Sequence, residues 1–161
     1  MKTIIDLLTE HVQAEADQVL YRYWENGGIS DQLTAADLDQ RARAVAARLQ
    51  EVSAPGDRVI IVLPQSLHPI TAFFACMFTG TVAVPVPLAP TNRLEVLKRY
   101  LVDAGAQTIL TLSSISASLK PEAQAEWSRL SPQIRIMQSF LKAWEMRQMI
   151  QTVYISLPWE E

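Results

Sequence analysis

Cysteine and charged side chains are both scarce in this chain of 161 residues. The single cysteine, Cys76, excludes an internal disulfide and a metal site built from cysteines, and it predicts a reducing, cytoplasmic location. Charged residues make up 19% of the chain and the net charge is −3. Because nucleic-acid-binding proteins usually carry a basic face, this balance predicts no nucleic-acid partner.

Motifs that bind phosphates or expose a nucleophile are missing as well. The sequence contains no G-x-G-x-x-G, no G-x-x-x-x-G-K-[ST] and no G-x-S-x-G, and no glycine follows Gly105. In the proteins that carry them, these motifs cradle phosphates at a helix N-terminus or present a reactive serine on a sharp turn. The residues alone therefore indicate no active site.

The most distinctive stretch runs from Val59 to Asn92 and contains no charged residue. A membrane span needs about 20 apolar residues in one helix. Prolines interrupt this run, and its uninterrupted piece, from Ile70 to Val84, is too short, so we expect no membrane span. The order of strand, loop, helix, tight turn and strand predicts a buried βαβ unit whose two strands are parallel.

The remaining sequence predicts an α/β fold around this unit. Helices are expected at 3–14, at 35–50, at 70–79 with Gly80 as its C′ residue, from 91 or 92 to 104, and through Phe140, Leu141 and Trp144. Strands are expected at 19–24 and 29–33, joined as a hairpin by the turn signal Asn26-Gly27-Gly28, and at 57–63, 82–86, 107–112, 133–137 and 153–157, with 107–112 as a third parallel strand. Thr3 and Thr34 are expected to cap the first two helices, the latter with Asp37. Pro85 and Pro87 place the strand at 82–86 at a bulge, at an edge or at its end.

Apolar spacing predicts which helix faces are buried. In the first helix the predicted face includes the histidine at position 11, and in the crossover helix it is largely aromatic. The predicted faces are Ile4, Leu7, Leu8, His11 and Val12 for the first helix; Leu38, Ala42, Val45 and Leu49 for the second; and Ile70, Phe73, Phe74, Met77 and Phe78 for the crossover helix.

Few side chains could carry chemistry, and each has a structural explanation. His68 follows the strand at 57–63, at the edge where open α/β sheets bind ligands, but its place before Pro69 favours a helix start. His11 and Cys76 are interpreted as packed residues, and Arg41, Arg43 and Arg48 as solvated surface rather than a phosphate site. The carboxylates are interpreted as caps, turn residues or helix surface: Asp37, Asp39, Asp57, Glu95 and Asp103. No catalytic, cofactor-binding or metal residue is assigned.

Two groups of residues nevertheless resemble a known family. The first comprises Leu33-Thr34, Asp37-Leu38-Asp39, the helical run 41–49, Gly56-Asp57-Arg58-Val59 and Leu63-Pro64, and it resembles the opening of the adenylate-forming enzymes. The second comprises Phe73-Phe74-Ala75-Cys76, the stretch 80–87 with its Pro-Val-Pro, Arg93-Leu94 and Asp103-Ala104-Gly105-Ala106, and it is similar to the fatty acyl-AMP ligase branch.

The resemblance implies a fold and a reaction. The fold would be the opening βαβ layers of the doubly wound, mostly parallel sheet of a larger adenylation domain. The reaction would convert ATP and a fatty acid to an acyl-adenylate and pyrophosphate with Mg²⁺, and the acyl group would pass to an acyl carrier protein. The family's phosphate loop, its later nucleotide- and metal-binding stretches and its C-terminal domain with a lysine are absent from this sequence. No site residue is therefore carried over, and we expect this chain alone to bind neither ATP nor Mg²⁺ tightly.

The resemblance covers residues 1–136, which we interpret as a partial N-terminal adenylation subdomain. Residues 137–161 are interpreted as a divergent tail, which suggests a truncated, frameshifted or split gene. Three functions follow. The chain is the N-terminal portion of a fatty acyl-AMP ligase, inactive alone; or a non-enzymatic α/β module or subunit of a split ligase that binds the remaining part; or a degenerate product without function.

Overall fold

The structure is a computed structural model, and it describes residues 2–87, 93–112, 136–138 and 151–154. Within these residues the chain forms a hairpin, a five-stranded sheet and helices around that sheet. Its elements are α1 (Ile4–Ala14), β1 (Val19–Glu25), β2 (Gly28–Thr34), α2 (Ala35–Leu49), β3 (Arg58–Val62), α3 (His68–Thr79), β4 (Val82–Pro85), α4 (Arg93–Ala104), β5 (Thr108–Thr111), β6 (Ile136–Gln138) and β7 (Gln151–Tyr154).

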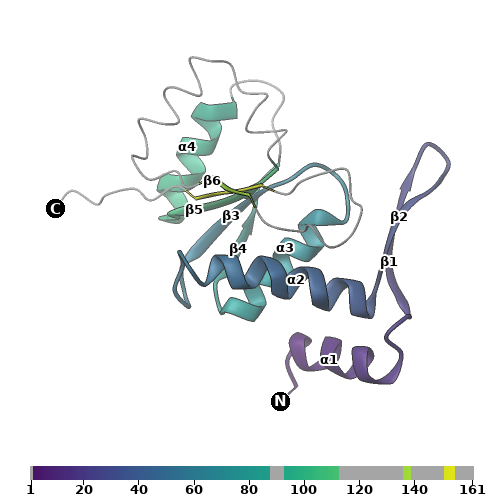
Figure 1. Cartoon of the computed structure of the whole chain (residues 1–161). Coiled ribbons are helices and arrows are strands. Elements are labelled where there is room, and N and C mark those ends of the chain that lie inside the picture. Colours follow the sequence, from purple (N-terminus) through teal and green to yellow (C-terminus); the bar gives the residue numbers. More distant parts are fainter. Residues whose placement is uncertain (1, 88–92, 113–135, 139–150, 155–161) are drawn as a thin grey trace.

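The elements are arranged in layers (Figure 1), with α4 on one face of the sheet and α2 and α3 on the other. The hairpin of β1 and β2 stands beside these layers, and α1 lies below α2 in the same view. None of the helices in the described ranges is both long and apolar enough to cross a membrane. The α/β fold class predicted from the sequence is confirmed.

Strand β3 opens the predicted βαβ unit, lies between β4 and β5 in the sheet and is buried on both faces. It pairs in parallel with β4 on one side and with β5 on the other, so both predicted parallel partners are confirmed. Val59 and Ile61 belong to the core cluster beneath α2 and α3, whereas Ile60 and Val62 belong to the cluster beneath α4. The absence of charge follows from this arrangement, because a strand covered on two sides has no solvated face.

Strand β4 forms one edge of the sheet and ends at Pro85, as its prolines predicted. Val82 N–H donates to Asp57 O at 2.7 Å and Val86 N–H donates to Ile61 O at 3.0 Å. In a parallel ladder alternate residues bond to the same neighbour, so Val84 also faces β3 while Pro85 faces away. The proline therefore sits where its missing N–H costs no ladder hydrogen bond.

The hairpin and α2 form where the local signals predicted them. Asn26 and Gly27 both have positive φ, of 52° and 83°, as a tight turn with the twist of a hairpin requires. Thr34 then caps α2: its hydroxyl accepts from Asp37 N–H at 3.1 Å while the Asp37 carboxylate accepts from the Thr34 hydroxyl at 2.8 Å. All the residues predicted for the inner face of α2 are buried: Leu38, Ala42, Val45 and Leu49.

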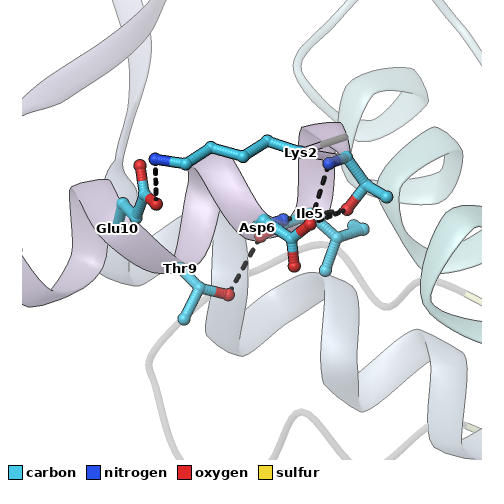
Figure 2. Close-up of polar contacts among 6 residues, drawn as sticks. Lys2, Ile5, Asp6, Thr9 and Glu10 are labelled. Atoms are coloured by element: carbon cyan, nitrogen blue, oxygen red, sulfur yellow. Dashed lines mark hydrogen bonds and ion pairs between the residues drawn. The ribbon is translucent and has the colours of Figure 1, made fainter.

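The predicted inner face of α1 is wrong, because the buried face is rotated about the helix axis by about one residue from the predicted one. Ile4 and Leu7 are 47% and 45% exposed and His11 is also exposed, whereas Ile5, Leu8 and Val12 pack against the hairpin and α2. Both stripes satisfy helical spacing, and packing selects between them. Figure 2 shows how the helix is held: Lys2 pairs with Glu10 at 2.6 Å, and the Thr9 hydroxyl donates to Ile5 O at 2.9 Å.

The predicted aromatic face of α3 is confirmed in part: Phe74 belongs to a core cluster, and Ile70 and Phe78 pack against that cluster. Of its five residues only Phe74 is buried, while Phe73 is 38% exposed. Small side chains point toward the sheet instead, because a helix that approaches a sheet closely leaves little room for rings. The residues of α3 that are buried besides Phe74 are Thr71, Ala72, Ala75, Cys76 and Thr79. Gly80 ends the helix with φ of 71°, the left-handed conformation predicted for it.

Helix α4 ends before Gly105 and β5 is a third parallel strand, as predicted. After β5 the predicted and observed elements agree only in part. The strand predicted at 133–137 corresponds to β6, which begins three residues later and ends one residue later, and the strand predicted at 153–157 corresponds to β7, which begins two residues earlier and ends three residues earlier. Strand β7 pairs antiparallel with both β5 and β6, so the sheet is parallel only across β4, β3 and β5. The helix predicted through Phe140, Leu141 and Trp144 lies outside the described residues.

Candidate functional site

The carboxyl ends of β3, β4 and β5 lie at one edge of the sheet because these three strands are parallel. Open α/β sheets bind ligands at this edge. After β3 the edge carries residues 63–67, after β4 it carries Val86 and Pro87, and β5 ends there at Thr111. We take this edge as the candidate site, because His68, the residue for which the sequence suggested a ligand-binding role, lies there.

The loop after β3 uses its polar groups within itself. The Ser66 hydroxyl donates to Pro64 O at 3.2 Å and accepts from His68 N–H at 3.2 Å. Leu67 precedes the helix and makes no side-chain capping bond, while Leu63 and Leu67 are buried beneath the loop. The loop therefore fixes the start of α3, and none of its hydroxyl or amide groups forms a nucleophile–base pair with His68.

His68 is the first residue of α3 and is half-buried. Burial lowers the pKa of this imidazole below its usual 6.5; the charge of Asp31 on β2 opposes that change, and the charge of Arg41 on α2 adds to it. The charges that act on His68 thus lie on the hairpin and on α2. The other histidine, His11, lies on α1 and is exposed.

Because the pKa of His68 is lower in the folded chain than in the unfolded chain, the free energy of unfolding should decrease as the pH falls. The unfolded chain takes up a proton near pH 6.5, and the folded chain does so only at lower pH. The free energy of unfolding is then fully retained above pH 6.5, decreases as the pH falls below it, and levels off below the folded pKa.

His68→Gln should flatten this part of the pH profile, measured by urea unfolding at a series of pH values between about 7.5 and 5. His11→Gln is the matched control, since His11 is exposed, and it should leave the slope of the parent chain unchanged. An equal slope in the parent and in His68→Gln would contradict the assignment.

Cys76 is fully buried on the side of α3 that packs on the sheet, as predicted. Burial raises the pKa of its thiol, and its carbonyl oxygen accepts hydrogen bonds from the hydroxyls of Thr79 at 2.9 Å and Thr81 at 3.3 Å. A nucleophilic cysteine needs a lowered pKa and access to solvent. Cys76 has neither, so its surroundings are those of a core residue.

Thr111 is the one feature of this edge that the sequence did not indicate. Its side chain is 3% exposed, and its hydroxyl has no hydrogen-bond partner, unlike every other buried side-chain oxygen or nitrogen in the described part of the chain. Burying a hydroxyl without a partner costs about 1–3 kcal/mol. In the sequence it is one threonine among several in a β-rich segment, and no local signal distinguishes it.

Asp37, Asp39 and Asp103 lie in the cap and helix positions predicted for them. Asp37 caps α2, Asp39 accepts from Arg43 Nε at 2.8 Å, and Asp57 accepts from Ala54 N–H at 2.7 Å across the turn before β3. Asp103 is exposed on α4, which also contains Glu95. Across the described residues, no three His, Cys, Asp or Glu side chains are grouped to hold a metal ion.

Comparison with known proteins identifies the family to which this chain belongs. A profile of the AMP-binding enzyme family matches residues 8–156. The medium-chain-fatty-acid–[acyl-carrier-protein] ligase JamA of Moorena producens (strain JHB) is 34% identical over 136 residues, which are 80% of this chain and 23% of that protein. The long-chain-fatty-acid–AMP ligase FadD32 of Mycolicibacterium smegmatis is 40% identical over 88 residues, 52% of this chain and 14% of the relative.

The solved structures agree with the sequence matches. The fatty acyl-adenylate ligase from Legionella pneumophila, whose crystal holds acyl adenylate and pyrophosphate, is 27% identical with a TM-score of 0.66, over 73% of this chain and 21% of that one. This chain thus spans between about a seventh and a quarter of the length of these relatives. The resemblance read from the sequence is confirmed, and the chain belongs to the AMP-binding enzyme family of adenylate-forming enzymes.

Proposed function

We propose that this chain supplies the opening α/β layers of a fatty acyl-AMP ligase. In that reaction a carboxylate oxygen of the fatty acid attacks the α-phosphorus of ATP. The bond from this phosphorus to the bridging oxygen breaks, and pyrophosphate leaves. The observation that carries the proposal is the parallel order of β4, β3 and β5 with α3 and α4 on opposite faces, in a chain whose relatives are fatty acid ligases.

The role of this part is to form and position one edge of a larger site. Charge on the transferring phosphates must be absorbed by donors and a metal ion. Asp37, Asp39 and Asp57 are occupied in a cap, an ion pair and a turn, and across the described ranges no three His, Cys, Asp or Glu side chains are grouped to hold Mg²⁺. We therefore propose that the nucleotide, the metal and the catalytic groups are held by parts of the ligase fold that this chain does not span.

The substrates and partners follow from the same proposal. JamA is named as acting on a medium-chain fatty acid and an acyl carrier protein, and FadD32 as acting on a long-chain fatty acid. We propose a fatty acid and an acyl carrier protein for the complete ligase, in the cytoplasm. The boundary predicted near residue 136 stays a prediction, since β7 lies in the predicted tail and pairs with β5.

Fatty-acid-dependent exchange between ATP and pyrophosphate tests the proposal in two parts. The purified chain should show no exchange above a blank, with the Legionella ligase as the positive control. A chimera, in which this chain replaces the stretch of that ligase that it matches, should show exchange. Robust exchange by the chain alone would refute its inactivity, and a folded chimera without exchange would count against the scaffold role.

A second candidate function is a non-enzymatic module that binds a partner, such as the separate remainder of a split ligase. It is favoured by one observation, the exposed aromatic side chain of Phe73 on a helix without charge. Both functions would use the surface of α3 around Phe73.

A further inference from the structure

Helix α3 carries no charged residue on any side. Its sequence is HPITAFFACMFT, whereas α1 contains Asp6 and Glu10, and α2 contains five charged residues that include Asp39 and Arg43. A helix at a protein surface normally presents a charged or polar face to water, and one that is apolar all round is normally buried. The composition of α3 is therefore that of an interior helix.

The structure covers α3 on two of its sides. Ala72, Ala75 and Cys76 pack on the sheet in the cluster that contains Val59 and Ile61. Toward α2 and α1, Phe74 is buried with Leu8 and Leu38 in a second cluster. Phe78 packs against the same cluster, and the guanidinium of Arg43 covers its ring at 4.5 Å from the ring centroid.

The third side is open. Pro69, Phe73 and Met77 recur every four residues and so form one stripe along the helix. Phe73 is 38% exposed, and Pro69 and Met77 are half-buried. We define these three residues as the α3 stripe. Unlike the other two sides of α3, the α3 stripe belongs to none of the core clusters formed by the described residues.

We propose that the α3 stripe is a docking surface for the later part of an adenylation domain, the part of the fold that this chain does not span. The inference rests on the proposed function. In the Legionella structure the matched portion is 21% of the chain, so a much larger body of the same fold remains to be packed against it. A charge-free helix is what such a permanent, core-like contact requires.

A second copy of this chain fits the stripe less well. A stable interface buries about 800 Å² on each partner. A large aromatic side chain contributes at most about 250 Å², and only one residue of the stripe is substantially exposed. The stripe is thus too small to hold a dimer by itself, whereas it suffices as one contact within a larger domain.

Binding in solution tests the proposal. The full chain is mixed with a labelled fragment of the Legionella ligase comprising the residues outside the matched stretch, and the Kd is measured by fluorescence anisotropy. We expect the parent chain to bind, and Phe73→Glu and Met77→Glu each to weaken binding at least tenfold. Val102→Glu is the matched control, because Val102 is a 74% exposed aliphatic residue on α4, outside the stripe. Circular dichroism checks that each variant folds.

The outcomes separate the two proposals. Binding of Phe73→Glu and Met77→Glu with the affinity of the parent would overturn the docking surface and leave the proposed function intact. A parent chain that elutes as a dimer, and becomes a monomer on Phe73→Glu, would overturn it in favour of a second copy. Absence of binding by the parent would also overturn it, and the chimera's exchange activity would then decide the proposed function independently.

Discussion

Replacing Val84 with proline should lower the free energy of unfolding by about 3 kcal/mol or more. Val84 lies between two residues that donate to β3, Val82 at 2.7 Å and Val86 at 3.0 Å, and the parallel ladder turns its own N–H the same way. Proline would remove that donor, leave a β3 carbonyl unpaired and bring its ring against the neighbouring strand. Unfolding in guanidinium chloride, followed by circular dichroism, measures the loss.

Pro85→Val is the matched control, since Pro85 is the next residue of the same strand and is exposed. It faces away from β3, so the substitution disturbs no ladder bond. It should cost less than about 1 kcal/mol, chiefly because the unfolded chain gains freedom. Equal losses for Val84→Pro and Pro85→Val would show that the register of β4 on β3 is not the one described.

The same alternation explains why the βαβ unit could be predicted from the sequence. Val59, Ile60, Ile61 and Val62 are apolar on consecutive positions, and only a strand covered on both faces buries such a run. Pro85 and Pro87 recur with the period of a strand, which limited β4 to an edge or an ending. Thr34 and Asp37 likewise fixed the start of α2, because a capping box is a local interaction.

The orientation of α1 and α3 could not be predicted in this way. In α1, the stripes through Ile4 and Ile5 both have helical spacing and share Leu8, so only contact with Leu33 and Leu38 decides between them. In α3, no charged residue marks a solvent side, so spacing gave the largest side chains too much weight. Packing on the sheet selected Ala72 and Ala75 instead, because small residues allow the closest approach.

The candidate edge was predictable in place but not in content. The position of the edge follows from the parallel strands. The presence of His68 at this edge follows from its place in the sequence shortly after β3. The unpartnered hydroxyl of Thr111 depends on distances between elements far apart in the sequence, and so does the Arg43–Phe78 contact elsewhere in the fold. Local pattern carries no information about such contacts. The family match places the edge in an adenylate-forming fold, whose chemistry needs groups beyond those described.

Ile60→Ala should be the most damaging truncation of the core. Ile60 is completely buried on β3, and it packs with Leu101 and Ile109 between the sheet and α4. Removing its methyl and ethyl groups leaves a cavity that paired strands on both sides cannot close. We expect a loss of about 2–5 kcal/mol in the free energy of unfolding, measured by guanidinium chloride titration.

Val102→Ala serves as the control on the same side of the sheet. Val102 is 74% exposed on α4, one residue from the buried Leu101, so its truncation should change the free energy of unfolding by about 0.5 kcal/mol at most. A double variant of Ile60→Ala with Leu101→Ala should depart from additivity, because both side chains border one cluster. Additive losses would mean that α4 does not close over Ile60, and that the layer on this face of the sheet is held in another way.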